Sequence, residues 1–368
     1  MTTALTPRLR TASLQDYPRI RGLEARHLPA TLSEASWLGL FLDNPLWSRL
    51  GASWPVGWVF ENTDGELVGS IGNVPSLYRF RGEEYVCANG RSWVIEPEYR
   101  AYALMLMDEY YQQPGAQLFV NTTVGPDGAA TADMFATRIP LGDWQSYAIA
   151  ITRYRPFARR ALEKKGVPGA APLSLPAAAA LWCADALRSL PPVPPSVEVT
   201  RLERFDARFD AFWSELVRTR PDTLLAVRDE RTLNWHYAEP LRAGQVRILT
   251  ATRAGLLRGY CVLRLRTLPD GLRCLRLIDY RSLEQDVDLL PALLRAALRT
   301  ARQENLHIVE HLGRGLPGMR AFDEFARYRF PRQCWAYYYR TPDPVLAEAL
   351  SGVRAWDPSE YDGDASLY

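Results

Sequence analysis

The first 155 residues change from a strand-like to a helical hydrophobic pattern and then back to strands. A strand is predicted near residues 8–12, and two helices follow, the second capped by Ser33. From Gly57 to Ile95, apolar runs separated by the turns at 62–65 and 81–82 predict an antiparallel meander. A helix, a buried strand at 116–123, a short helix and a strand at 144–154 come next. We expect this last strand to close the unit.

The segment Cys87–Gln113 joins a strand to a helix. The strand ends at Ile95, Glu96 and Pro97 break it, and Arg100 opens a helix with apolar positions at 104, 107, 110 and 111. A single crossover helix predicts that the strands ending at Ile95 and beginning at Ala116 are parallel neighbours. Backbone N–H groups and the helix dipole favour an anionic group where a strand end meets a helix start.

The second half of the chain repeats this order of elements. A strand at 197–202 is followed by helices, a hairpin whose Gly255 and Gly259 match Gly65 and Gly69 in spacing, and a strand at 272–280. A helix at 286–303, a strand at 306–313, a short helix at 319–328 and a strand at 334–340 complete it. The repeat predicts an α/β fold with mixed sheets in two tandem domains. We expect domains at 1–155 and 196–368, separated by an Ala/Pro-rich linker at 156–195 that contains one helix.

Composition agrees with two soluble domains. The chain has 368 residues, 47% hydrophobic and 23% charged, and a net charge of +2 that weighs against nucleic acid as a partner. Only Lys164 and Lys165 are lysines, so 42 of the 44 basic residues are arginine, a bias typical of a GC-rich bacterial genome. Both lysines fall at an exposed helix end, which argues against a Schiff-base lysine or a P-loop.

Location and metal chemistry are constrained by a few positions. The five cysteines form no C-x-x-C pair, so reduced thiols are expected. The N-terminus has no hydrophobic leader, and the most apolar tract, 172–187, is short and contains Asp185, so we expect a cytoplasmic protein without a membrane span. The sequence His307-Ile308-Val309-Glu310-His311 matches a zinc-protease pattern but falls on a predicted strand, so no metal is predicted. Oligomeric state stays open.

Two motifs and the order of elements resemble the GNAT acyltransferase superfamily. One is the G-x-L-x-G hairpin at 65–69, and the other is the strand running into Val94-Ile95-Glu96-Pro97-Glu98-Tyr99-Arg100 before a helix. The chain looks like two GNAT-like domains in tandem. The resemblance implies acyl-CoA as a co-substrate. It also implies that Val94 and Ile95 offer backbone groups to the pantetheine arm, and that the loop of Arg100, Ala101, Tyr102, Ala103 and Leu104 wraps the pyrophosphate.

The second copy of this loop differs from the first. Residues 281–286 contain no glycine and include acidic side chains where phosphates would lie. Repulsion would oppose an anion at this helix start. We therefore expect the second domain not to bind CoA.

The resemblance also gives three candidate site residues. GNAT chemistry needs a base to deprotonate the acceptor and a group to protonate the thiolate. Glu96 is the candidate base, or else a solvated turn residue, and Tyr147 is the candidate acid, or else a packing residue. Asn121 is a candidate hydrogen-bond partner of the pantetheine arm, or else a turn-forming residue.

The function expected from the resemblance is transfer of an acyl group from acyl-CoA, or another acyl carrier, to an amine or hydroxyl of a small molecule or sugar. Two alternatives stay open. One is a Fem-type transferase that uses aminoacyl-tRNA, and the other is a non-catalytic ligand-binding or scaffold protein. The acidic, aromatic segment 356–364 is expected either to dock on the arginine-rich second domain or to be a disordered end.

Overall fold

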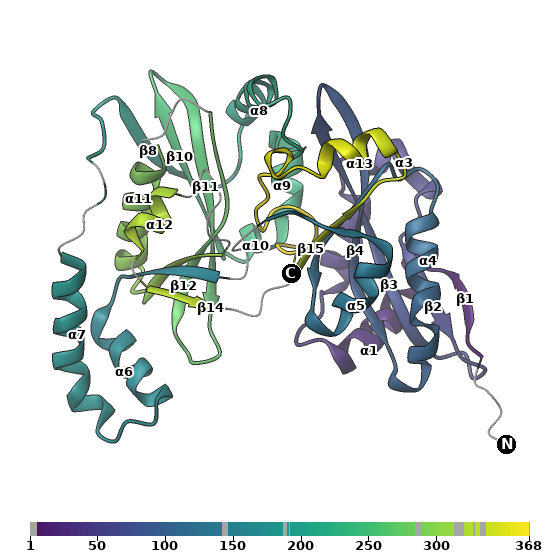
Figure 1. The fold of residues 1–368 in the computed structure, drawn as a ribbon, viewed down its shortest axis with the longest axis horizontal. Helices are drawn as coiled ribbons and strands as arrows, with labels where there is room; N and C mark the ends of the chain where they lie inside the picture. The colour runs from purple at the N-terminus through teal and green to yellow at the C-terminus, as the bar shows by residue number, and fades with distance from the viewer. Residues whose placement is uncertain are drawn as a thin grey trace. The chain divides into compact units, whose positions relative to one another are not determined.

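The computed structural model describes residues 6–141, 146–186, 190, 192–283, 289–312, 320–326, 328–331 and 336–367. The chain forms two compact units (Figure 1). The first unit consists of residues 1–140, 221–236 and 335–368, and the second of residues 141–220 and 237–334.

The first unit contains a mixed sheet and helices from three separate parts of the chain. Its elements are β1 (Arg8–Thr11), η1 (Leu14–Asp16), α1 (Tyr17–His27), α2 (Glu34–Leu42), α3 (Trp47–Leu50), η2 (Gly51–Ser53), β2 (Gly57–Glu61), β3 (Leu67–Phe80), β4 (Glu83–Ile95), η3 (Pro97–Tyr102), α4 (Ala103–Gln112), β5 (Leu118–Val124), α5 (Pro126–Phe135), β6 (Thr137–Arg138), β9 (Leu225–Ala226), α9 (Glu230–His236), β15 (Ala336–Arg340), α13 (Pro344–Leu350) and η5 (Val353–Ala355).

The second unit is built from the same kinds of element. They are β7 (Ser146–Ile151), α6 (Tyr154–Lys164), α7 (Ala170–Ala186), β8 (Val197–Leu202), α8 (Arg208–Thr219), α10 (Ala238–Arg242), β10 (Val246–Arg253), β11 (Leu256–Thr267), β12 (Arg273–Ser282), α11 (Leu289–Gln303), β13 (Ile308–Leu312), α12 (Arg320–Phe325) and β14 (Tyr328–Pro331).

The two sheets have one topology. The first runs β1-β2-β3-β4-β5-β15-β6, with β9 added beside β3, and the second runs β8-β10-β11-β12-β13-β7-β14. In each, one adjacent pair is parallel, β4 with β5 and β12 with β13, and a helix connects its two strands. The repeated α/β unit and the mixed sheets predicted from the sequence are therefore confirmed.

The two units exchange one strand each. β15 follows the second unit in the chain but pairs with β5 of the first, whereas β7 follows the first unit and pairs with β13 of the second (Figure 1). The expectation that the strand at 144–154 closes the first unit is wrong. The compact units consequently differ from the contiguous ranges 1–155 and 196–368. Both strands occupy the same place in the repeat, so the order of elements alone does not show which sheet receives each.

The sheet of the first unit separates two hydrophobic clusters. Val59 and Val74 pack with α1 and α2, whereas Phe60 and Ile71 pack with α4. Alternate residues of one strand point to opposite faces, so α1 and α2 cover one face and α4 the other. We call these the α1 face and the α4 face.

Two further segments differ from their expected structure. Residues 156–195 were expected to contain one helix, but α6 and α7 pack together there as a helical pair of the second unit. Segment 356–364 was expected to dock on the second domain or to be disordered, but it packs in the first unit, where Trp356, Tyr361 and Asp364 are buried.

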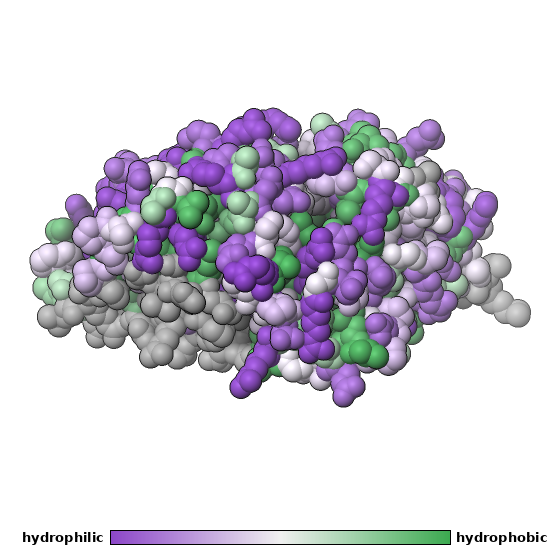
Figure 2. All heavy atoms as spheres, turned by 90° about the horizontal axis from the view of Figure 1, so that it is seen from above, coloured by the Kyte–Doolittle hydropathy of each residue, from purple (hydrophilic) through white to green (hydrophobic). Residues whose placement is uncertain are grey.

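One face of the molecule is mostly hydrophilic among the described residues (Figure 2). On the face seen in Figure 2, hydrophilic residues predominate and hydrophobic residues form small separate patches. Among the helices in the described part of the chain, none has the length and apolar character needed to cross a membrane.

Candidate functional site

Among the described residues, the parallel strands β4 and β5 pair over a short stretch, in the middle of β4 and at the start of β5. Within the described residues, the paired positions are Cys87 with Leu118 and Ala88 with Phe119. β4 continues to Ile95 and β5 to Val124, but among the described residues no pair beyond Ala88 and Phe119 joins these two strands to each other. The predicted parallel pairing is confirmed, and the strands separate toward their carboxyl ends. We call the space between them the β4–β5 gap.

Asn121 of β5 bridges the β4–β5 gap through hydrogen bonds of its side-chain amide. Its Oδ1 accepts a hydrogen bond from the Gly90 amide at 3.0 Å and lies 2.9 Å from the Tyr110 hydroxyl, and its Nδ2 donates to the Tyr111 hydroxyl at 2.7 Å. A Cβ atom at position 90 would lie 2.6 Å from Asn121 Oδ1, so the contact requires glycine. Both ends of the Asn121 amide thus have protein partners, and its contact with a pantetheine arm stays a prediction.

A bulge in β4 lies beyond the last residue of this strand that pairs with β5. Ser70 pairs with Val94 and Gly72 pairs with Arg91, so Ile71 alone faces both Ser92 and Trp93, and Ser92 has φ of 50°. Such bulges re-aim side chains and disturb local pairing. Ser92 Oγ and Trp93 Nε1 are buried and have no hydrogen-bond partner among the described residues. Buried polar groups normally have partners, so these two unpartnered atoms are unusual.

The sequence pattern identifies Tyr110 and Tyr111 only as apolar helix positions. Their rings pack with Phe119 at centroid distances of 5.4 and 5.2 Å, and their hydroxyls reach Asn121 in the gap. Burial raises the pKa of both phenols, so they stay protonated donors. The signal that could have identified them is a pair of adjacent tyrosines on the buried side of the helix that connects two parallel strands.

The predicted pyrophosphate loop forms η3 and the start of α4. Arg100, Ala101 and Leu104 are exposed, Ala103 is partly exposed, and Tyr102 packs against Phe60 at 6.1 Å between ring centroids. The Ala103 amide donates to the Arg100 carbonyl, because η3 runs directly into α4. The Ala103 amide therefore already has a hydrogen-bond partner, whereas the first backbone amides of a helix that starts after an open loop have none within the helix.

Val94 and Ile95 end β4 beside β3. Val94 is buried and pairs with Ser70, while Ile95 is half-buried and pairs with Gly69. Their expected contact with a pantetheine arm is not tested by these positions.

Glu96 lies on the β3 side of β4. Its carboxylate contacts Arg26 at 2.7 Å and His27 at 2.9 Å on α1, and the Glu96 amide donates to the Val68 carbonyl. Burial of the carboxylate raises its pKa, but the hydrogen bonds from Arg26 and His27 outweigh burial and leave the pKa below its ordinary value. Glu96 borders a hollow of about 590 Å³ whose lining comes from α1, β3, η3 and the β2–β3 turn. A carboxylate held in this way is a weak base.

Tyr147 belongs to the second unit. It lies on β7, opposite Leu312 of β13 and Phe330 of β14. The structure therefore places it in a different sheet from Glu96 and Asn121. Its expected position on the strand that closes the first unit was wrong because β7 and β15 are exchanged.

A buried carboxylate from the C-terminal segment meets the end of β5. Asp364 accepts hydrogen bonds from the Thr122 and Thr123 hydroxyls at 3.1 and 2.9 Å and is 0% exposed. The segment is held further by Arg228, whose guanidinium lies 3.4 Å from Asp362 and 4.2 Å from the Tyr361 ring centroid. Sequence reasoning missed Asp364, because more than 200 residues separate it from Thr122.

The same segment closes a small cavity on the α1 face. Its volume is about 180 Å³, and its polar lining includes Ser76, Asn89, Asp229 and His236. His236 Nε2 lies 2.6 Å from Ser366 Oγ. The cavity therefore combines polar groups from β3, β4, α9 and the C-terminal segment.

In the second unit, the zinc-protease pattern is indeed on a strand. Residues 308–312 form β13, and buried Glu310 pairs with Arg276 of β12 at 2.5 Å. Of the glycine-free segment 281–286, residues 284–286 lie outside the described residues, as does Cys334. The expectation that the second unit does not bind CoA stays a prediction.

Comparison with models of protein families finds no match. Comparison with curated proteins by sequence also finds none.

Solved structures do resemble the chain. A GCN5-related N-acetyltransferase from Anabaena variabilis has a TM-score of 0.55 at 12% identity, over 92% of this chain and 73% of that one. A GCN5-related N-acetyltransferase from Kribbella flavida gives 0.54 at 14%, over 94% and 73%. The Saccharomyces cerevisiae N-myristoyltransferase with bound myristoyl-CoA gives 0.54 at 10%, over 93% and 81%. The predicted resemblance is confirmed at the level of structure: the chain has the fold of the GCN5-related N-acetyltransferases.

Proposed function

We propose that the first unit is an acyltransferase that moves an acyl group from acyl-CoA, or another acyl carrier, to an amine or hydroxyl of a small molecule or sugar. The observation that carries the proposal is the end of β4–β5 pairing at Ala88, together with the buried Ser92 Oγ and Trp93 Nε1 of β4, which have no hydrogen-bond partner among the described residues. A pantetheine arm carries amides and a thioester, which supply matching donors and acceptors. The solved N-myristoyltransferase of the same fold contains myristoyl-CoA, which supports acyl-CoA as co-substrate.

Arg100 is our proposed contact for the pyrophosphate. Its side chain is exposed beside the end of β4, and among the described residues it has no ion-pair partner. Guanidinium groups bind phosphate through paired, charge-assisted hydrogen bonds. In this proposal Val94 and Ile95 flank the pantetheine arm, Ala101 to Leu104 lie beside the phosphates, and Asn121 forms the floor beneath the thioester.

Acyl transfer requires two proton movements. The acceptor nitrogen or oxygen attacks the thioester carbon and loses a proton, and the carbon–sulfur bond breaks with a proton delivered to sulfur. We assign the second movement to Tyr111. Its oxygen accepts from Asn121, and its own proton has no acceptor among the residues that the structure describes.

We assign removal of the acceptor's proton to Asp364. This carboxylate is buried at the end of β5 and accepts hydrogen bonds from the neutral hydroxyls of Thr122 and Thr123. Glu96, in contrast, forms an ion pair with the guanidinium group of Arg26 on the β3 side. Glu96 remains the alternative base. Substitution distinguishes the two assignments, since Asp364→Asn and Glu96→Gln each remove one of two carboxylates that lie on opposite sides of β4.

Calorimetry with acetyl-CoA and a longer acyl-CoA tests binding. Arg100→Gln should weaken binding about tenfold through loss of a charged contact, and Arg21→Gln, an exposed arginine of α1, should not change it. Thiol release with a panel of amines and sugars then tests turnover. Tyr111→Phe and Asp364→Asn should each lower kcat at least tenfold, whereas Glu96→Gln should not. Failure of every acyl-CoA to bind would refute acyl-CoA as the carrier.

A non-catalytic ligand-binding protein is the second candidate. Two observations favour it: Asn121 bridges the gap, and the Ala103 amide is occupied within the helix start. Acyl-CoA binding without thiol release, unchanged in Tyr111→Phe and Asp364→Asn, would support this candidate over the enzyme.

A further inference from the structure

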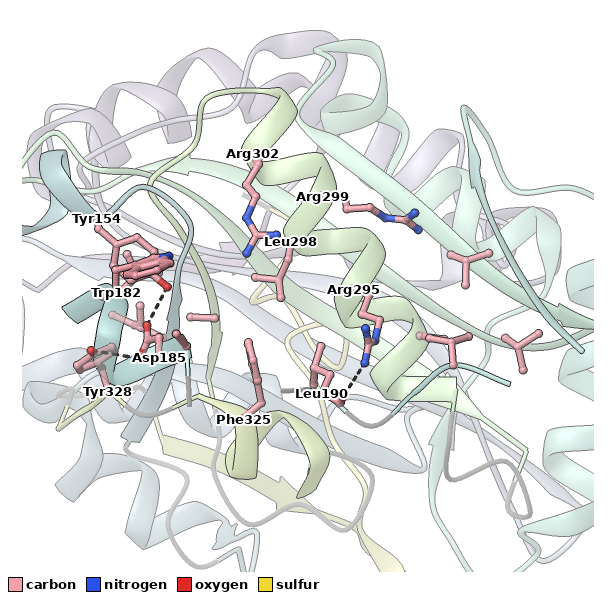
Figure 3. Close-up of a pocket in the computed structure, with 18 residues that line it drawn as sticks. Tyr154, Trp182, Asp185, Leu190, Arg295, Leu298, Arg299, Arg302, Phe325 and Tyr328 are labelled. Atoms are coloured by element: carbon pink, nitrogen blue, oxygen red, sulfur yellow. Dashed lines mark hydrogen bonds between the residues drawn. The ribbon is translucent and has the colours of Figure 1, made fainter. Parts of the chain in front are cut away.

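The second unit contains a cavity of about 670 Å³ beside α11 (Figure 3). Its lining comes from β7, β8, α6, α7, α11, α12 and β14, all within that unit. Cavities of a few hundred cubic ångströms are typical of sites for small organic molecules. Much of its lining is apolar, with Ile149 and Ile151 from β7, Val197 and Val199 from β8, and Leu298 from α11.

Three arginines of α11 border this cavity. Arg295, Arg299 and Arg302 are spaced by four and three residues and lie on successive turns of α11, and Figure 3 shows the Arg299 and Arg302 side chains pointing in different directions. Arg295 is half-buried and donates to the Leu190 carbonyl. Arg299 and Arg302 are exposed, and within the described part of the chain no carboxylate or carbonyl oxygen pairs with either guanidinium.

The carboxylate of the cavity does not neutralise these arginines. Asp185 of α7 accepts hydrogen bonds from Tyr154 at 3.1 Å and from Tyr328 at 3.3 Å (Figure 3). Burial and the adjacent Asp185 raise the pKa of Tyr154, so its hydroxyl stays a donor. The positive charge of Arg299 and Arg302 is therefore available to a ligand.

An exposed aromatic side chain lines the same cavity. Trp182 of α7 is 58% exposed although it lines the cavity. A ligand that covered this ring and the apolar lining would gain hydrophobic free energy of about 25 cal/mol per Å² of apolar surface removed from water. The cavity thus offers apolar and aromatic surface together with two unpaired cations.

We propose that this cavity binds a small organic anion, in which a phosphate or carboxylate head is joined to an apolar or aromatic body. Arg302 holds the head, Arg299 adds positive charge at the border of the cavity, and Trp182 and the apolar lining cover the body. Guanidinium groups suit both heads because their donors match two oxygens at once. The site lies in the second unit and does not depend on the function proposed for the first.

Calorimetry of the full chain with 1-naphthyl phosphate and with naphthalene-1-acetate tests the site and separates the two heads. We expect one binding site, weakened at least about tenfold in the double variant Arg299→Gln/Arg302→Gln. Arg218→Gln/Arg242→Gln is the matched control, since it removes the same charge from two exposed arginines of the same unit that pair only at the surface. The control should bind as the unchanged protein does.

Two further probes separate the head from the body. Trp182→Ala should weaken binding of 1-naphthyl phosphate several-fold, and neutral 1-naphthol should bind more weakly than either anion. Absence of saturable binding for both naphthyl anions, or equal affinity in the double variant and its control, would overturn the proposal. Inorganic phosphate binding as tightly as 1-naphthyl phosphate would overturn the part played by the apolar body.

Discussion

The Asn121 side chain accepts a hydrogen bond from the Gly90 amide at 3.0 Å, just beyond the last paired residues of β4 and β5. An amide side chain from one strand thus replaces a backbone carbonyl as partner of the other. Two strands that separate would otherwise leave backbone groups buried without partners. Asn121 therefore stabilises the separation that creates the β4–β5 gap.

Asn121→Ala should destabilise the first unit. It leaves the Gly90 amide and the hydroxyls of Tyr110 and Tyr111 without their Asn121 partner, at a cost of about 1–3 kcal/mol. The midpoint of urea-induced unfolding measures this loss. Asn62→Ala in the exposed β2–β3 turn is a comparison in which only turn contacts change. An unchanged midpoint for Asn121→Ala would show that the gap does not depend on this side chain.

Gly363→Ala should release the C-terminal segment. Gly363 has φ of 71°, and a Cβ atom there would lie 2.4 Å from Thr122 Oγ1. Strain and contact together should cost more than about 1 kcal/mol and expose the segment to proteolysis. Gly352→Ala is the control, because nothing lies within 4 Å of its added Cβ. Equal proteolysis rates for the two variants would contradict the packing described for Asp364.

Glu96→Gln should alter the pH dependence of stability. The folded protein lowers the pKa of Glu96 from 4.5, so the ionised carboxylate stabilises the fold above that pH. This stabilisation is lost as pH falls through the lower folded pKa, and its size should be at most about 1 kcal/mol for a partly exposed pair. Thermal unfolding measured across this acid range should show a shallower decline for Glu96→Gln. Glu98→Gln, an exposed neighbour, should retain the unchanged protein's profile.

Cysteine labelling should separate an exposed thiol from buried ones. Cys183 is exposed, whereas Cys87, Cys261 and Cys274 are buried, and burial raises the pKa of these three thiols. A maleimide added to the native protein should label Cys183 and leave the other three unmodified until unfolding. Peptide mass spectrometry identifies the sites. Rapid labelling of Cys87 would contradict the closed packing between β4 and β5.

Local patterns were sufficient for much of the fold. Ser33 was predicted to cap a helix, and its side chain accepts from the Ser36 amide at the start of α2. The crossover between β4 and β5 required a parallel pair because one helix separates them, and the repeated order of elements required a second copy of the unit. Periodicity and connection length are local properties, so they can be read without knowledge of distant contacts.

The candidate site was only partly accessible in this way. The sequence located the strand end at Val94 and Ile95 and the helix start near Arg100. It did not show that Glu96 pairs with α1, because that contact depends on how α1 packs against the sheet. It also gave no indication that Tyr110 and Tyr111 meet Asn121 in the gap.

By itself, the sequence determined that the chain has two copies of one α/β unit, and that the strand-to-helix junction of the first copy is the place to seek an anion or acyl-carrier site. Only the tertiary structure decided which sheet receives β7 and which receives β15, and that Asp364 meets Thr122 and Thr123 at the end of β5. The physical reason is that β7 and β15 occupy equivalent places in the repeat, so the order of elements is compatible with either assignment. Pairing over long sequence separations is selected by the packing of the whole unit, which no local pattern records.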